Sequence, residues 1–551
     1  MRGVCDAKRL RQPDIQRAKH PRGDQWFCLS IRADGVMLRA GGEAGERYGR
    51  LALEQLGVGA QRAVPAVEIE DWPDFAVRGV MLDISRDKVP TMATLRQLVD
   101  QLSGLRINQL QLYTEHTFAY RGHEKVWRGC SPMTATQARA LDAYCAARGV
   151  ELVPNQNSFG HMERWLKHEP YRRLAETTGP WKTPWGTTRD YPTTLTPGDP
   201  GSLRLMTGLY DQLLPNFQSR LFNVGCDETF ELGQGRSAEE CRKHGVGRVY
   251  LDYLLKLHRT VRQRGRRMMF WSDIIHEHPE LIRHLPRDVI PLVWGYEADH
   301  PFMKQCGELK RCGLEFYVCP GTSSWCSFSG RTTNAMANLR NAAAAGKKHG
   351  ATGYLITDWG DYGHRQYEPV SYGPILDGAA LSWCAKSNAG IDAGREVSRC
   401  FFGDATSKFG SLWLEAGCVH EASGISIKNR TVLFTMMDTP LTEIPRIKGL
   451  SAKRIAAMRR AIATLKKKVR TADPTTGELA ATLNVLDHAC RRGESAFMRT
   501  GTEQKKLIRD LAKDLKKIVA THQRLWKARN RPGGLSSSVS YFENALRAYK
   551  S

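Results

Sequence analysis

Residues 221–228 read LFNVGCDE, a short apolar run that ends in two adjacent carboxylates. Such a run is typical of a buried strand. Seven further segments follow the same plan, an apolar stretch and then polar or aromatic side chains. In chain order they are VMLDIS (80–85), INQLQLYTE (107–115), VELVPNQN (150–157), RMMFWSD (267–273), VIPLVWGYE (289–297), LEFYVCPGT (314–322) and GYLITDWGD (353–361).

Amphipathic segments with helical spacing lie between these runs. They include MATLRQLVDQLSGLR (92–106), ATQARALDAYCAARG (135–149) and LDYLLKLHRTVRQRG (251–265). Eight strand–helix units over about 300 residues are typical of an α/β fold of the TIM (β/α)8 barrel type. A barrel gathers its functional side chains where its strands end, so we expect the polar strand ends to form one site.

The segments on either side of the barrel differ from it. Residues 25–75 predict the remnant of a small α/β domain: two strands joined at Asp34-Gly35, a helix that stops at Gly57, and a linker with Pro65 and Pro73. Residues 1–24 are expected to be a basic tail and 76–400 the barrel. Residues 401–551 predict a basic helical domain, with helices over 451–470 and 502–530.

The positive charge is concentrated at the ends of the chain. The formal net charge is +24, yet residues 451–551 alone contain 23 Lys/Arg against 8 Asp/Glu. The barrel itself is nearly neutral, which argues against a nucleic-acid-binding function for it. The basic end either binds a polyanion or is a solvated helical surface, and the sequence leaves both readings open.

Cysteine spacing and hydropathy exclude several classes of protein. None of the 14 Cys forms a C-x-x-C pair, so we expect free, mostly buried thiols and no metal site. No apolar stretch approaches the ~20 residues of a membrane span. The N-terminus is basic without an apolar core, so the sequence as it stands predicts a cytoplasmic protein. An upstream start would instead allow a secreted or periplasmic one.

Asp227 and Glu228 are the first candidates for chemistry. Adjacent strand residues point to opposite sides, so both face a pocket only if the strand bends or ends there. On the dipeptide alone, a solvated loop start is the competing interpretation. Trp271, Trp294 and Trp359 end three other strands, and indoles around one rim can wall an apolar box, although each alone also fits core packing.

Together these residues resemble a known family. RGVMLDISR (78–86), His161 in NSFGHM, NVGCDE (223–228), WSD (271–273), VW (293–294) and WGD (359–361) occur in that order. The set resembles the catalytic barrel of the glycoside hydrolase family 20 β-N-acetylhexosaminidases. The resemblance covers about residues 76–400, and residues 25–75 resemble the end of the small domain that precedes the barrel there.

The resemblance implies a mechanism without a protein nucleophile. The 2-acetamido oxygen of the substrate attacks the anomeric carbon and forms a cyclic oxazolinium intermediate. Glu228 matches the general acid, for which a raised pKa is expected, and Asp227 the residue that orients the acetamido group. Arg86 and Asp361 match residues that bind sugar hydroxyls. His161 matches a residue that supports the acidic pair, with a purely structural role as the alternative.

The remaining substrate-binding candidates come from the box and the strand ends. They are Trp271, Trp294 and Trp359, the strand-end residues Glu115, Asp273 and Glu297, and Trp325 in the loop after strand seven. Arg78, at a strand start, is expected to be structural.

Three positions depart from the family pattern. Asn223 stands where a His is usual, and Glu115-His116 where many members have two Asp. The Tyr that binds the acetamido oxygen is not identified, since Tyr317 lies in mid-strand. The insert 158–220 fits either the substrate rim or a partner contact.

The sequence therefore predicts an exo-acting retaining β-N-acetylhexosaminidase that needs no cofactor or metal. Its expected partner is a glycan with a terminal β-linked N-acetylhexosamine, with no nucleic acid. The alternative is a non-catalytic carbohydrate-binding or scaffold barrel with a polyanion-binding C-terminal domain. The sequence leaves open the oligomeric state and the choice between GlcNAc and GalNAc.

Overall fold

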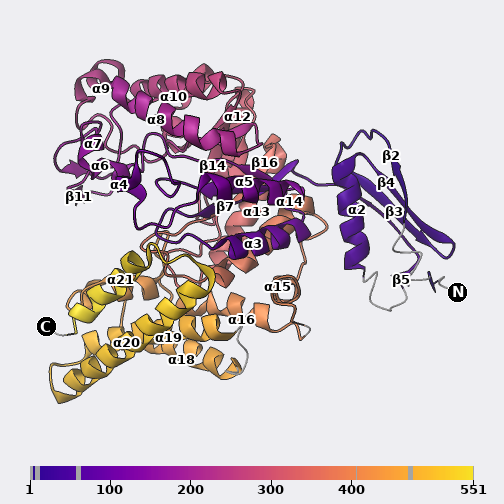
Figure 1. Ribbon diagram of the computed structural model, residues 1–551. Helices are drawn as coiled ribbons and strands as arrows, with labels where there is room; N and C mark the ends of the chain where they lie inside the picture. Colours follow the sequence, from indigo (N-terminus) through magenta and orange to yellow (C-terminus); the bar gives the residue numbers. More distant parts are fainter. Residues whose placement is uncertain (1–3, 6–12, 57–63, 405, 470–475, 550–551) are drawn as a thin grey trace.

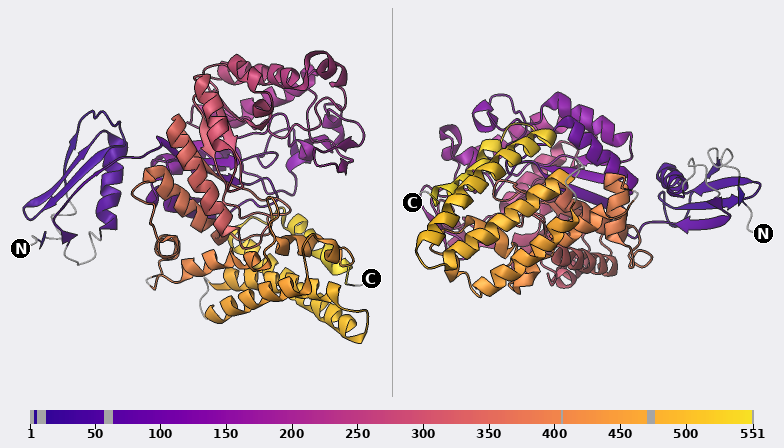
Figure 2. Two further views of the ribbon diagram at one scale, coloured as in Figure 1. Left: turned by 180° about the vertical axis from the view of Figure 1, so that it is seen from behind. Right: turned by 90° about the horizontal axis from the view of Figure 1, so that it is seen from below.

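The computed structural model describes residues 4–5, 13–56, 64–404, 406–469 and 476–549. It has three parts: a small N-terminal domain at one end, a central barrel, and a group of C-terminal helices along one side of the barrel (Figure 1). Two further views show the same arrangement (Figure 2).

The central part is an eight-stranded parallel barrel, which confirms the predicted TIM barrel. The eight strands run in the sheet order β12-β13-β14-β15-β16-β7-β8-β9, and a parallel bridge between Asn155 and Asn223 joins the two ends. Each strand lies within one of the eight predicted runs or overlaps it. The strands are β7 (Val77–Asp83), β8 (Gln109–Tyr113), β9 (Glu151–Val153), β12 (Leu221–Asn223), β13 (Arg267–Trp271), β14 (Ile290–Trp294), β15 (Tyr317–Cys319) and β16 (Gly353–Asp358).

Helices surround the barrel because their apolar faces pack on the outward side of the strands. Those predicted over 92–106, 135–149 and 251–265 are present; Thr91 and Thr134 cap the first two. The long helices are α3 (Met92–Gly104), α5 (Ala135–Ala146), α8 (Pro200–Leu213), α10 (Val246–Gln263), α12 (Phe302–Arg311), α13 (Thr332–His349) and α14 (Tyr372–Cys384). The short ones are α4 (Glu124–Trp127), α6 (Glu163–Leu166), α7 (Glu169–Arg172), α9 (Ala238–His244) and α11 (Asp273–Glu277).

The insert after β9 carries secondary structure of its own. Besides α6, α7 and α8, it contains an antiparallel hairpin of β10 (Trp181–Lys182) and β11 (Thr188–Arg189). Single 3-10 turns complete the barrel, namely η1 (Leu214–Asn216), η2 (Pro279–His284) and η3 (Glu368–Ser371).

The N-terminal domain is a four-stranded sheet covered by one helix. The predicted hairpin is formed by β3 (Phe27–Arg32) and β4 (Gly35–Ala40), with α2 (Glu43–Gln55) packed on it. The predicted helix end at Gly57 lies outside the described residues.

Two predicted boundaries of this domain change. β2 (Asp14–Arg17) pairs with β4, so part of the expected tail belongs to the sheet. β6 (Val67–Asp71) pairs with β3 where we expected a linker, because its alternating apolar side chains complete the sheet face. A two-residue ladder joins β1 (Val4–Cys5) to β5 (Val64–Pro65).

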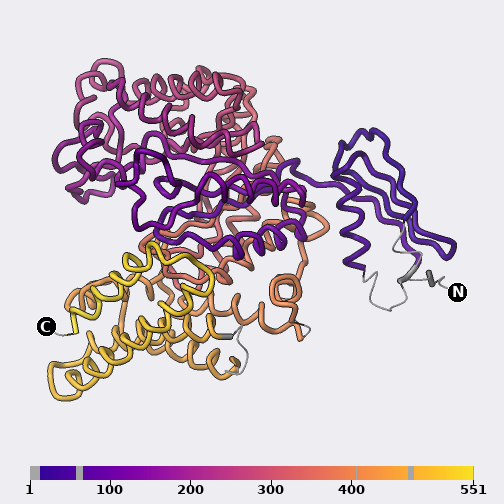
Figure 3. The backbone as a smooth tube through the Cα atoms, viewed as in Figure 1, coloured from indigo at the N-terminus to yellow at the C-terminus, as the bar shows by residue number. Residues whose placement is uncertain are grey.

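The N-terminal domain docks where the barrel strands begin. Arg78, at the start of β7, is fully buried and donates to the Tyr48 hydroxyl at 2.8 Å and to Gln25 at 2.8 Å. Its guanidinium also lies over the ring of Trp383. Arg78 is therefore structural, as expected, and the opposite ends of the strands are left for the site. The chain trace shows the N-terminal domain at this end of the barrel (Figure 3).

The C-terminal domain is helical, as predicted. Its helices bury apolar residues at helical spacing; in α18 these are Ile455, Met458, Ile462 and Leu465. The helices are α15 (Ala393–Phe402), α16 (Phe409–Ala416), α17 (Val432–Asp438), α18 (Ala452–Lys468), α19 (Thr476–Phe497), α20 (Thr502–Arg529) and α21 (Leu535–Arg547), with turns η4 (Val419–Ser423) and η5 (Ile444–Arg446). Since α15 crosses residue 400, the predicted boundary there cuts through a helix.

The C-terminal domain packs against loops that follow barrel strands. Arg529 O accepts a hydrogen bond from Thr91 N, and Arg531 N donates to Val89 O. Arg365, in the loop after β16, forms a bidentate ion pair with Asp438. The helices therefore lie beside the rim at which the strands end.

Two predictions from composition also meet the structure. The thirteen cysteines from Cys28 to Cys490 are all free, and most of them are buried. Among the described helices, none is both long and apolar enough to cross a membrane.

Candidate active site

Asp83 fixes the turn that follows β7. This buried carboxylate accepts hydrogen bonds from the backbone N–H groups of Ser85 (2.8 Å), Arg86 (3.0 Å) and Gly360 (3.0 Å). It therefore ties the ends of β7 and β16 together. The turn brings the Arg86 side chain to the rim.

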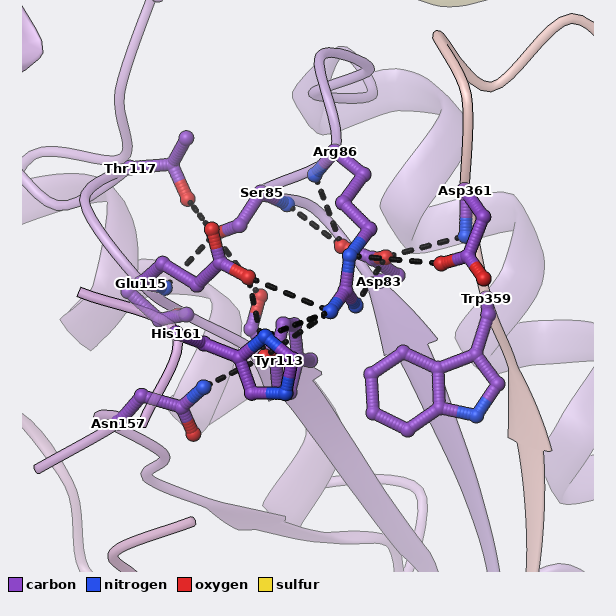
Figure 4. A network of polar contacts seen from close by, with 12 residues as sticks. Asp83, Ser85, Arg86, Tyr113, Glu115, Thr117, Asn157, His161, Trp359 and Asp361 are labelled. Atoms are coloured by element: carbon purple, nitrogen blue, oxygen red, sulfur yellow. Dashed lines mark hydrogen bonds and ion pairs between the residues drawn. The ribbon is translucent and has the colours of Figure 1, made fainter. Parts of the chain in front are cut away.

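Arg86 is the centre of a polar network (Figure 4). Its guanidinium lies 3.1 Å from Asp83 Oδ2, 3.4 Å from Asp361 Oδ1 and 3.5 Å from Glu115 Oε1. The same group lies 4.9 Å from the ring centroids of both Tyr113 and Trp359. Three carboxylates and two rings thus hold one guanidinium, whose side chain stays 20% exposed.

The acidic pair sits on a strained turn after β12. The strand ends at Asn223, and Gly225, Cys226 and Glu228 then have positive φ values of 69°, 73° and 50°. A Cβ on Gly225 would lie 1.8 Å from Asn157 Oδ1, so a glycine is required there. This backbone lets two adjacent carboxylates face the same side.

His161 shows that they do. Its Nε2 lies 3.3 Å from Asp227 Oδ2 and 3.5 Å from Glu228 Oε2, while Arg86 Nη2 lies 3.3 Å from its Nδ1. Burial lowers the pKa of His161, but the charges of Asp227 and Glu228 outweigh this and raise it to about 10. His161 thus links Arg86 to the acidic pair.

The two carboxylates differ in environment. The Asp227 side chain is 7% exposed, and Glu228 is 35% exposed. Burial, reinforced by the charge of Asp227 and opposed by His161, raises the pKa of Glu228. Within the described ranges, Asp227 Oδ1 is buried without a hydrogen-bond partner. Glu228 is thus suited to hold a proton, and Asp227 to accept a hydrogen bond from a ligand.

Asp273 lies behind Glu228. Its Oδ2 accepts the Glu228 backbone N–H at 3.0 Å, and its Oδ1 accepts Trp294 Nε1 at 3.3 Å. Both Asp273 oxygens therefore accept hydrogen bonds from the protein, and the sugar-binding role expected from the sequence stays a prediction.

The predicted indoles form one aromatic cluster with Tyr296. Trp271 and Trp359 have ring centroids 5.9 Å apart, and Trp359 Nε1 donates to the Tyr296 hydroxyl at 2.7 Å. Tyr296 stacks on Trp294 and meets Trp325 edge-on at 4.9 Å. The cluster connects the ends of β13, β14 and β16 with the loop after β15.

Two predicted ligands are instead engaged with other protein groups. Both Glu297 oxygens pair with Arg331, at 2.9 and 2.6 Å, and one also accepts Asn429 N at 2.7 Å. Glu115 is 1% exposed and accepts the Tyr113 hydroxyl at 3.0 Å. Burial raises the pKa of Glu115 to about 7. The sugar-binding roles expected for these two carboxylates stay predictions.

Asn223 and Tyr317, at which the sequence departs from the family pattern, are both buried inside the barrel. Asn223 is buried at the end of β12, below the turn that carries Asp227 and Glu228. Its side chain accepts a hydrogen bond from Gly225 N and donates one to Gln111. Tyr317 is buried in the barrel as the first residue of β15, so it lies away from the rim at which the strands end.

Sequence reasoning missed Tyr296 and Asn429. Tyr296 follows Trp294 by two residues, and the alternation of a strand could have indicated that the two share a face. Asn429 comes from the C-terminal domain, and its Oδ1 accepts Trp325 Nε1 at 3.0 Å. No local signal marks it.

Comparison with known proteins decides the family. Residues 75–335 match the model of the glycosyl hydrolase family 20 catalytic domain. The barrel belongs to this family. The match ends before β16, although Trp359 and Asp361 follow that strand.

Relatives of the family 20 barrel are distant. Human Hexosaminidase D is 25% identical over 53% of this chain and 61% of its own length. Beta-hexosaminidase from Akkermansia muciniphila is 26% identical over 37% of this chain and 45% of its own length. The matches thus cover less than two thirds of these relatives.

Solved structures share the fold. Flavobacterium johnsoniae chitobiase superposes with a TM-score of 0.60 at 16% identity, over 93% of this chain and 88% of its own. A crystal structure of a beta-N-acetylhexosaminidase gives 0.58 at 18% identity, over 71% and 92%.

Proposed function

We propose that this protein is an exo-acting, retaining β-N-acetylhexosaminidase that uses the acetamido group of its substrate as the nucleophile. The observation that carries this proposal is the arrangement around His161, where Asp227 and Glu228 face one side although they are adjacent in sequence. Membership of family 20 makes a glycan with a terminal hexosamine the expected substrate class.

In the first step, the acetamido oxygen attacks the anomeric carbon as the bond to the leaving oxygen breaks. Glu228, whose pKa is raised by burial, gives its proton to that leaving oxygen. Asp227 Oδ1, buried without a protein partner in the described ranges, accepts the acetamido N–H and stabilises the positive charge that develops on it.

In the second step, water attacks the anomeric carbon from the side that the leaving group has vacated. Glu228, now a carboxylate, accepts a proton from this water, and the oxazolinium ring opens to restore the acetamido group. Two inversions at the same carbon give overall retention.

The other residues bind and orient the sugar. Arg86 and Asp361, already paired at 3.4 Å, present a donor and an acceptor to hydroxyl groups. The cluster of Trp271, Trp294, Trp325 and Trp359 excludes water from the acetamido methyl group. Tyr296 accepts from Trp359 through its oxygen and keeps its own O–H to donate.

A matched pair of substrates tests the proposal. We expect release of the aryl group from an aryl β-N-acetylglucosaminide and none from the aryl β-glucoside, which lacks the acetamido group. Turnover of both would indicate a protein nucleophile instead. Turnover of neither would favour a non-catalytic barrel.

Replacement of the acid tests the role of Glu228. On a disaccharide, E228Q should reduce kcat by ~10²–10⁴-fold, the usual contribution of acid–base catalysis. The matched control is E240Q, an exposed residue on α9 that contacts only His244 among the ion pairs described. Wild-type turnover by E228Q would assign the acid elsewhere.

A further inference from the structure

The hairpin of β10 and β11 exposes aromatic side chains. Trp185, at its tip, is 57% exposed, and Tyr191, just beyond it, is 45% exposed. Trp181 is buried beneath them and donates through Nε1 to Tyr191 O at 2.9 Å. Exposed Trp and Tyr so close together are more typical of a binding surface than of a solvated loop.

Hydrogen bonds fasten this hairpin to the segment that follows Glu228, and those of Glu231 are buried. Glu231 accepts hydrogen bonds from Thr177 on one flank of the hairpin and from Thr193 on the other. Gln234 bonds both the N–H and the C=O of Lys182, at 3.0 and 2.9 Å. The hairpin and the segment that follows Glu228 therefore form one unit.

Phe230 connects the unit to the acid itself. Its N–H donates to Glu228 O at 2.8 Å, and its ring meets Trp185 edge-on with centroids 5.6 Å apart. A glycosidic oxygen protonated by Glu228 places the sugar of the leaving group next to this segment. β11 lies on the side of the barrel away from the N-terminal domain, as the rim does (Figure 1).

The Arg189 side chain holds these aromatic side chains in place before any ligand binds. The guanidinium of Arg189 lies 5.7 to 5.8 Å from the ring centroids of Trp181, Trp185 and Tyr191. Such contacts reduce the freedom that a side chain loses on binding. The exposed rings can therefore receive a ligand at a small entropic cost.

We propose that this hairpin, with Trp185 at its centre, binds the first sugar on the leaving side of the bond that is cleaved. This inference rests on the proposed function and specifies its substrate class: an oligosaccharide in which a further sugar follows the terminal N-acetylhexosamine. The C–H face of a pyranose ring packs against an indole, since both surfaces are apolar. The insert 158–220 thus belongs to the substrate rim.

The test compares two substrates that both require protonation by Glu228. One is the disaccharide of two β-linked N-acetylglucosamines, and the other is methyl β-N-acetylglucosaminide, whose leaving group is too small to reach the hairpin. For W185A, kcat/KM on the disaccharide should fall about tenfold, which corresponds to roughly 55 Å² of buried apolar surface. On the methyl glycoside it should stay unchanged.

Two further variants make the result specific. W185F keeps a flat ring and should stay within about threefold of the wild type on the disaccharide. F497A removes another exposed aromatic side chain, on α19, and should leave kcat/KM unchanged on both substrates.

An equal effect of W185A on both substrates, or none on either, would overturn this inference while leaving the proposed function intact. A wild-type protein that cleaves neither substrate would overturn the proposed function and this inference with it.

Discussion

Replacing Asp273 by Asn separates a positioning role from direct sugar binding. In the wild type, its two oxygens accept Glu228 N and Trp294 Nε1. Asn has one carbonyl oxygen, so one of these donors must face the amide NH2 group. The unmatched donor weakens the support of a turn in which Glu228 has a φ of 50°.

The magnitude follows from the burial of this contact. An unpaired donor costs about 1–3 kcal/mol, and because the Glu228 bond is only partly buried we expect about 1–2 kcal/mol. If this appears in the transition state, kcat falls about 5- to 30-fold. KM should change little, because neither Asp273 oxygen is available to the sugar.

The assay is the steady-state kinetics of D273N on the β-linked disaccharide, with thermal unfolding as a check of integrity. The matched control is D252N, an exposed carboxylate on α10 that pairs with Arg248 of the same helix. A raised KM with unchanged kcat would refute the reasoning and restore Asp273 as a sugar ligand. A wild-type kcat would show that the turn does not need it.

Two predictions concern pH. Because burial raises the pKa of Glu228 and the acid acts in its protonated form, kcat/KM should decrease as pH rises through that pKa, and the decrease should be absent from the residual activity of E228Q; a shared decrease would point to another group. Burial lowers the pKa of Lys88 to about 7 from 10.5, so between these values the unfolded chain binds a proton that the folded chain does not, and the wild-type stability should rise with pH. K88M should therefore have a higher Tm than the wild type below pH 7, by a margin that shrinks toward pH 10 in thermal scans; a margin that does not depend on pH would contradict this.

The barrel could be predicted because its periodicity is local. Each strand is a short apolar run that ends in polar residues, and each helix shows the spacing of an amphipathic surface. Strands such as β2 and β6 were missed because they are short and carry charged residues. Their pairing depends on a neighbouring strand that the local pattern does not encode.

The site could be predicted only as a set of residues. That Asp227 and Glu228 face one side depends on the positive φ values of Gly225, Cys226 and Glu228. The sequence does not indicate such values for Cys226 and Glu228. That Glu297 is used by Arg331 and Asn429 depends on partners 34 and 132 positions away. The sequence therefore predicts which residues lie at the strand ends, whereas the contacts of each of these residues depend on distant parts of the chain.

Because of the contacts of Asn429, two domains together build the aromatic cluster at the rim. Its side chain holds Trp325 and its backbone holds Glu297, so the helical domain and the rim loops constrain each other's sequences. An exchange of this domain for an unrelated one during evolution would disturb the aromatic cluster at once. We therefore expect the two parts of the chain to have been inherited together and to vary in concert at these contacts.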